Sequence, residues 1–105
     1  MSEDFVRVAD TSEIPPGSMK VLKLASGEIF IANIDGSFFA LPNKCTHVGG
    51  PLGRGRLTGS VVQCPWHGSK FDVRTGAVVQ GPAARPEIPI ELKIENTSIW
   101  AKKPV

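Results

Sequence analysis

Two short motifs, each with one cysteine and one histidine, constrain this chain more than any other feature. The first is Cys45-Thr46-His47 and the second is Cys64-Pro65-Trp66-His67, with sixteen residues between them. Together they use both cysteines and both histidines of the 105-residue chain. Thiolate and imidazole are ligands for zinc, copper and iron–sulfur centres, and metal binding is coupled to folding in small domains. The sequence therefore predicts a fold organised around a metal centre.

The bulk composition is typical of one globular domain. Apolar residues make up 41% of the chain and charged residues 21%, which excludes a disordered polypeptide. The 11 glycines and 9 prolines favour many turns and few helices. The formal charge of +2 is too small to indicate a nucleic-acid partner.

Alternating apolar residues and β-branched content predict a nearly all-β chain. Asp35-Gly36 is a strong signal for a tight hairpin turn. Residues 42–57 hold four glycines and Pro51, so neither a helix nor a strand is expected there. The predicted strands cover residues 5–9, 20–24, 28–33, 37–41, 60–63, 71–73, 77–79, 88–94 and 98–102.

The chain shows no signal for a membrane. It has no run of about 18 apolar residues, and its acidic start, Met1-Ser2-Glu3-Asp4, lacks the apolar segment of a signal peptide. We therefore expect a cytoplasmic protein with no membrane partner. In that compartment two lone cysteines are expected to be ligands and not a disulfide.

Two kinds of metal site are compatible with the four ligands. One is a single zinc ion held by two cysteines and two histidines. Zinc fingers, however, usually pair like with like along the sequence. Here each motif supplies one sulfur and one nitrogen, which suits a binuclear centre in which one iron takes both thiolates and the other takes both imidazoles.

These motifs resemble the signature of the Rieske family, and the likeness extends from Cys45 through His67-Gly68 to Thr75-Gly76. The resemblance implies one domain over residues 1–105, an antiparallel β sandwich or barrel. Residues 1–42 and 84–105 would form the scaffold, and residues 43–83 an inserted cluster-binding subdomain. It also implies one 2Fe–2S cluster. The two irons of this cluster would be bound by Cys45 with Cys64 and by His47 with His67.

The residues around the second motif set an expectation for the reduction potential. Neutral imidazoles in place of thiolates place Rieske centres at roughly −150 to +300 mV, against about −400 mV for plant-type ferredoxins. High-potential relatives add a disulfide between the cluster loops and hydrogen bonds from a serine and a tyrosine. Here Ser69 matches the serine, Phe71 replaces the tyrosine, and no further cysteine exists. We expect a low-to-intermediate potential, raised by Ser69.

The resemblance also implies a role. Small members of the family carry one electron from a flavin-dependent ferredoxin reductase to a terminal oxygenase and have no catalytic residues of their own. The alternative is a small Rieske subunit that serves a larger reductase chain such as nitrite reductase. An oxygenase would need a further mononuclear iron with two histidines and a carboxylate. Both histidines of this chain are already assigned, so that interpretation fails.

Overall fold

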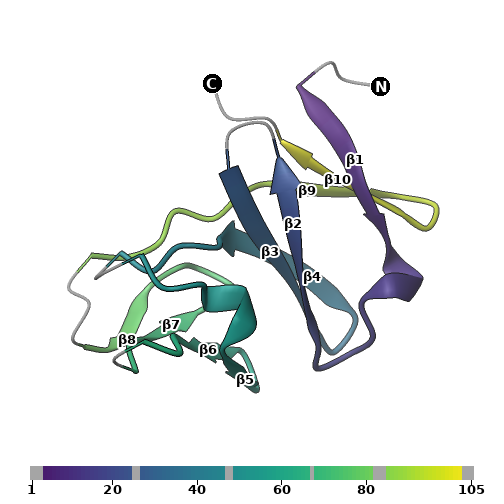
Figure 1. The fold of residues 1–105 in the computed structure, drawn as a ribbon. Helices are drawn as coiled ribbons and strands as arrows, with labels where there is room; N and C mark the ends of the chain where they lie inside the picture. The colour runs from purple at the N-terminus through teal and green to yellow at the C-terminus, as the bar shows by residue number, and fades with distance from the viewer. Residues whose placement is uncertain (1–3, 25–26, 47–48, 67, 82–84, 103–105) are drawn as a thin grey trace.

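The computed structural model describes residues 4–24, 27–46, 49–66, 68–81 and 85–102. Its strands form three antiparallel sheets, so the all-β expectation is confirmed (Figure 1). The first sheet joins β1 (Phe5–Asp10), β10 (Ser98–Lys102) and β9 (Leu92–Glu95) in that order. The second joins β2 (Met19–Leu24), β3 (Gly27–Ile34) and β4 (Ser37–Pro42), and the third joins β5 (Arg56–Thr58), β6 (Val61–Gln63), β7 (Lys70–Asp72) and β8 (Val78–Gln80).

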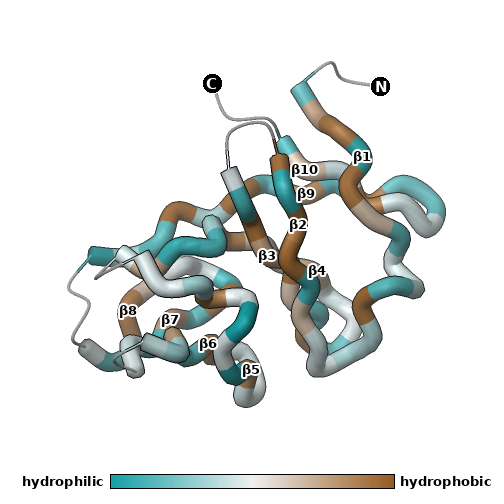
Figure 2. Tube along the Cα trace, in the orientation of Figure 1, coloured by the Kyte–Doolittle hydropathy of each residue, from teal (hydrophilic) through white to brown (hydrophobic). Residues whose placement is uncertain are grey.

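Strand β3 is the centre of the molecule because both of its faces are buried. Successive side chains of a strand point to opposite faces, and here Ile29 and Ile31 join the core shared with the β1–β10–β9 sheet. Phe30 and Ala32 join a second core, which also contains residues of β6 and β7. Figure 1 shows the β2–β3–β4 sheet between the other two sheets, and Figure 2 shows β3 as a largely apolar strand. The second core also contains Cys45 and Cys64.

The hairpin between β3 and β4 forms as the sequence predicts. Asp35 and Gly36 have φ angles of 53° and 93°, the left-handed pair that a tight two-residue hairpin turn requires. Asn33 fixes this end of the sheet, because its side-chain oxygen accepts a hydrogen bond from the Gly36 N–H at 2.7 Å. Its amide donates to the carbonyl of Ile14, also at 2.7 Å.

Residues 42–57 are more ordered than the sequence analysis predicts. They contain a short 3-10 helix, η2 (Leu52–Arg54), and the start of β5, so the expectation of neither helix nor strand is wrong. Strand β5 pairs with β6 across a turn in which Gly59 has a φ of 60°. Gly53 explains the tight packing of η2, because a Cβ there would lie 2.6 Å from the Cβ of Phe30.

Several predicted strand boundaries also require correction, most of them by a single residue. The strand predicted over residues 88–94 begins only at Leu92, and Ile90 makes a single bridge to Ala40. Pro89 has no N–H to give to a ladder, which accounts for the late start. Strand β7 covers Lys70–Asp72 and not residues 71–73. The turn residues Ala25-Ser26 and Pro82-Ala83 lie outside the described residues.

Candidate metal centre

The two cysteine motifs begin loops that are closed in the same way. The N–H of Cys45 donates a hydrogen bond to the carbonyl of Gly50, and the N–H of Cys64 donates to the carbonyl of Ser69, both at 2.8 Å. Each bond joins a cysteine to the residue five positions later. The first loop follows β4 and the second connects β6 to β7. The two similar motifs of the sequence thus begin with the same backbone hydrogen bond.

Both cysteines are buried and neither forms a disulfide. Cys45 and Cys64 are 2% and 1% exposed, and both belong to the core that contains Phe30, Val62 and Phe71. A buried free cysteine can be simple packing. Two of them on two similarly closed loops, in one core, are placed where they could hold a metal together.

Gly50 brings the first loop directly against the second cysteine. A Cβ at Gly50 would lie 2.6 Å from the Cys64 sulfur and 3.2 Å from two side-chain atoms of Trp66. The Trp66 side chain is 51% exposed. Its backbone N–H donates a hydrogen bond to the Cys64 sulfur at 3.4 Å. Hydrogen bonds of this kind are one means of tuning a metal-bound sulfur.

Burial raises the pKa of the Cys64 thiol, and a hydrogen bond with the Cys45 side chain raises it further, while the Trp66 N–H opposes the shift. A thiol in this environment keeps its proton in the absence of metal. A bound cation reverses this preference, because a coordinated thiol is deprotonated. The chemistry of the pair therefore fits a metal, which would supply the positive charge that the site lacks.

The described residues thus supply the sulfur half of the predicted ligand set. His47 and His67 lie outside the described residues. Ser69, the predicted hydrogen-bond donor, is completely buried. The two buried sulfurs and the glycine that leaves space at Cys64 fit an iron–sulfur cluster, since such clusters are held by cysteine thiolates, with histidines on one iron in the Rieske type.

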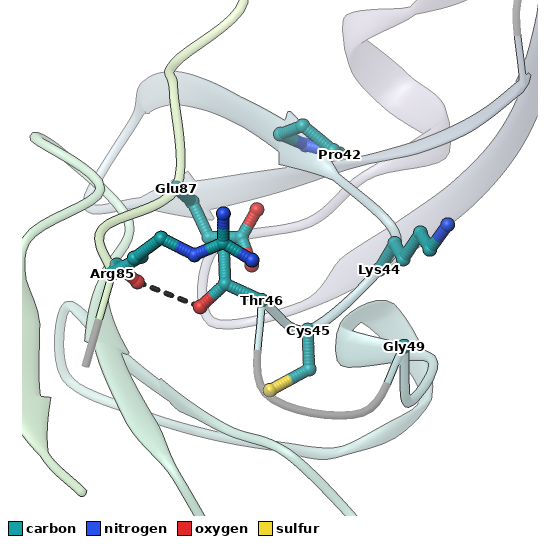
Figure 3. Close-up of a pocket in the computed structure, with 7 residues that line it drawn as sticks. All are labelled: Pro42, Lys44, Cys45, Thr46, Gly49, Arg85 and Glu87. Atoms are coloured by element: carbon teal, nitrogen blue, oxygen red, sulfur yellow. Dashed lines mark hydrogen bonds between the residues drawn. The ribbon is translucent and has the colours of Figure 1, made fainter. Parts of the chain in front are cut away.

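The segment before β9 is hydrogen-bonded to the first cysteine loop. This contact was not predicted from the sequence. The Thr46 hydroxyl donates a hydrogen bond to the carbonyl of Arg85 at 2.6 Å (Figure 3). The Thr46 N–H donates to the carboxylate of Glu87, which is 4% exposed. The other carboxylate oxygen, Oε2, is buried and has no partner among the described residues. Burial raises the pKa of Glu87 to about 7.

Glu87 is fixed in turn by a close backbone contact. Its N–H donates a hydrogen bond to the carbonyl of Gly76 at 2.8 Å. Gly76 has a φ of 79°, and a Cβ there would lie 1.9 Å from the carbonyl oxygen of Glu87. Only glycine fits this position. In the sequence, the one indication of this contact is that Gly76 belongs to Thr75-Gly76, the last pair of residues in the family resemblance described above.

An all-β chain that gathers two buried free cysteines on two similar loops fits the class of iron–sulfur proteins. More specifically, residues 4–98 match the model of the Rieske [2Fe-2S] domain, and the chain belongs to that family. Membership in this family implies a 2Fe–2S cluster. No helix in the described ranges is long and apolar enough to cross a membrane.

Relatives of known description include both small and large proteins. The chain is 35% identical over 96 residues to the biphenyl dioxygenase ferredoxin subunit of Pseudomonas sp. (strain KKS102), covering 90% of this chain and 88% of that protein. It is 32% identical over 95 residues to human apoptosis-inducing factor 3. That match covers 90% of this chain but only 16% of the human protein. The Rieske domain therefore occurs both by itself and as a small part of a longer polypeptide.

Solved structures share the whole fold. The ferredoxin of carbazole 1,9a-dioxygenase from Nocardioides aromaticivorans IC177 superimposes with a TM-score of 0.92 at 28% identity, covering 97% of this chain and 100% of that one. The Sphingomonas yanoikuyae B1 ferredoxin gives a TM-score of 0.88 at 27% identity, covering 94% of this chain and 98% of that one. The resemblance thus includes the scaffold as well as the cysteine loops.

Proposed function

We propose that this chain is a one-electron carrier that holds one 2Fe–2S cluster. The observation that carries the proposal is the pair of buried, disulfide-free cysteines on equivalently closed loops. Cys45 and Cys64 would bind one iron, and His47 and His67 the other. When bound, the cluster accepts and releases a single electron.

The chain's own residues set the environment of that electron. The core around the two cysteines keeps water from their sulfurs. The Trp66 N–H, and on our proposal the Ser69 hydroxyl, stabilise negative charge near the sulfurs by hydrogen bonding. In this arrangement residues 1–42 and 84–105 serve as the scaffold, and residues 43–83 as the cluster-binding subdomain.

The proposed partners are a flavin-dependent ferredoxin reductase, as electron donor, and a terminal oxygenase, as acceptor. Full-length relatives that are ferredoxin components of dioxygenase systems support this assignment over a small subunit of a nitrite reductase. The chain itself would perform no catalysis, and its location would be the cytoplasm.

Two measurements test the function. The purified chain should be red-brown, contain two irons per chain, and give after reduction an electron paramagnetic resonance signal whose average g value lies below that of the free electron. It should also restore product formation to a biphenyl dioxygenase system from which the native ferredoxin subunit has been omitted. A colourless protein containing zinc would overturn the cofactor. A correct cluster without any electron transfer in the reconstituted system would overturn the oxygenase assignment.

A further inference from the structure

The charges of this chain are distributed unevenly between the region of the cysteine loops and the rest. Residues 43–83 contain five basic residues and one acidic residue, which gives this segment a formal charge of +4. Since the whole chain has a formal charge of +2, the remaining residues together have a charge of −2. Because field strength near a surface depends on nearby charges more than on the total, the end that carries the loops is far more positive than the total suggests.

The first cysteine loop is flanked by two exposed cations. Lys44 and Arg85 line a pocket of about 430 Å³, together with Cys45 and Thr46. Arg85 is held there because its carbonyl accepts the hydrogen bond from the Thr46 hydroxyl (Figure 3). Glu87 also lines this pocket, but its carboxylate is buried.

The second cysteine loop has an equivalent pair. Arg54 and Arg56 line a pocket of about 370 Å³ with Cys64 and Pro65, and both arginines are exposed. Their backbone positions are well defined, since Arg54 ends η2 and Arg56 begins β5. Gly55 between them cannot accept a side chain, because a Cβ there would lie 1.9 Å from the carbonyl oxygen of Gln63.

These four cations differ from most basic residues of the β1–β10–β9 and β2–β3–β4 sheets. In the described part of the chain, none of the four takes part in an ion pair. By contrast, four basic residues on those two sheets form ion pairs with acidic residues: Arg7, Lys20, Lys93 and Lys102. Exposed, unpaired cations beside each of the two cysteines are available to a partner.

We propose that Lys44, Arg54, Arg56 and Arg85 form a basic docking surface for the acidic face of a redox protein. This inference rests on the proposed electron-transfer function and adds the chemistry of the partner. Complementary charge would steer the partner to the cysteine loops and raise the association rate, most strongly at low salt. The surface would also disfavour basic redox proteins, because like charges in contact are repulsive.

Small charged oxidants provide a direct probe of the local charge. The reduced chain is mixed in a stopped-flow instrument with anionic hexacyanoferrate(III) or with cationic tris(phenanthroline)cobalt(III). In each case one electron leaves the reduced cluster and reduces one Fe(III) or Co(III). The rate with the anion should fall as salt is added, and the rate with the cation should rise.

Matched variants separate local charge from net charge. The double variant Arg54→Gln, Arg56→Gln should lower the low-salt rate with the anion by roughly tenfold and flatten its salt dependence. The control Lys23→Gln, Lys102→Gln removes the same net charge from β2 and β10 and should leave the rate within roughly twofold of the wild type. Equal effects of the two double variants would overturn the proposal, because net charge alone would then account for the rates.

A protein probe tests the partner chemistry itself. Reduced flavodoxin, selected for an acidic surface, should reduce the oxidised chain faster at low salt than at high salt, and the Arg54→Gln, Arg56→Gln variant should lose this dependence. A rate with flavodoxin that rises with salt would overturn the acidic-partner inference while leaving the carrier function intact. Failure of the reduced cluster to react with any oxidant would instead overturn the proposed function.

Discussion

Gly50 and Cys64 lie in different loops, yet a Cβ on Gly50 would stand 2.6 Å from the Cys64 sulfur. Real side chains do not approach so closely, and the sulfur is buried in a core that leaves it little freedom to move. The glycine is therefore part of the cysteine site, although it carries no ligand atom. Its role is to let the two cysteine loops meet.

Replacement of Gly50 by alanine should damage the cluster site. The added methyl group must displace the Cys64 sulfur or the Trp66 ring, and overpacking of this kind costs roughly 1–3 kcal/mol. We expect less iron per chain and a lower ratio of visible to protein absorbance. The matched control is Gly59→Ala, which meets no atom within 4 Å but has a φ of 60° and so tests backbone strain alone. Equal iron content in the two variants would contradict the steric explanation.

The contact between Thr46 and Arg85 should stabilise the first loop. Thr46→Val keeps the shape of the side chain but removes the donor of the 2.6 Å hydrogen bond. The expected loss is roughly 0.5–1.5 kcal/mol, seen as faster bleaching of the visible absorbance in urea. Thr46→Ser keeps the hydroxyl and should bleach at nearly the wild-type rate. If valine and serine bleach alike, the hydroxyl does not hold the loop.

Ser69 should raise the reduction potential. A hydrogen bond to a cluster sulfur is stronger in the reduced, more negative state, so its removal makes reduction harder. If the hydrogen bond stabilises the reduced state more than the oxidised state by about 0.5–1.5 kcal/mol, its loss has a measurable effect on the potential. In protein-film voltammetry, Ser69→Ala should then lower the midpoint potential by roughly 20–60 mV. Ser37→Ala, at an exposed position at the start of β4, provides the control. An unchanged midpoint in the Ser69 variant would refute this role.

Local signals in the sequence were sufficient for much of the scaffold. Asp35-Gly36 specifies its own turn geometry, and the apolar, β-branched residues of β3 predict a strand where the structure has one. Strand β5 escaped prediction because the glycines around it suppress any propensity signal, although it is stabilised by pairing with β6. Only the first part of the strand predicted over residues 88–94 is wrong, because its apolar residues outweighed the effect of Pro89 in the prediction.

In the candidate site, too, local sequence signals predict some residues and not others. The spacing of Cys45 and Cys64 from their histidines predicts ligands, because coordination chemistry restricts which residues recur at such spacing. Glu87 offered no comparable signal. Its burial arises only when the segment before β9 crosses the first loop, and a lone glutamate in the sequence is expected to be exposed.

Glu87 should make the stability of the protein fall as pH rises. Its pKa is about 7 when folded, against an ordinary value of 4.5. Between these values the folded state keeps a proton that the unfolded state releases, so this group's contribution is complete below pH 4.5 and is lost as pH rises through about 7. The slope in this window reaches at most about 1.4 kcal/mol per pH unit.

The substitution Glu87→Gln should remove this dependence, because glutamine does not titrate and its side-chain oxygen can still accept the Thr46 N–H. We expect the variant to match the wild type in urea unfolding at acidic pH and to exceed it above neutral pH. Glu91→Gln changes an exposed residue that pairs with Lys102, and it should leave the pH profile of the wild type in place. Parallel profiles for the wild type and the Glu87 variant would show that the buried carboxyl does not titrate in this range.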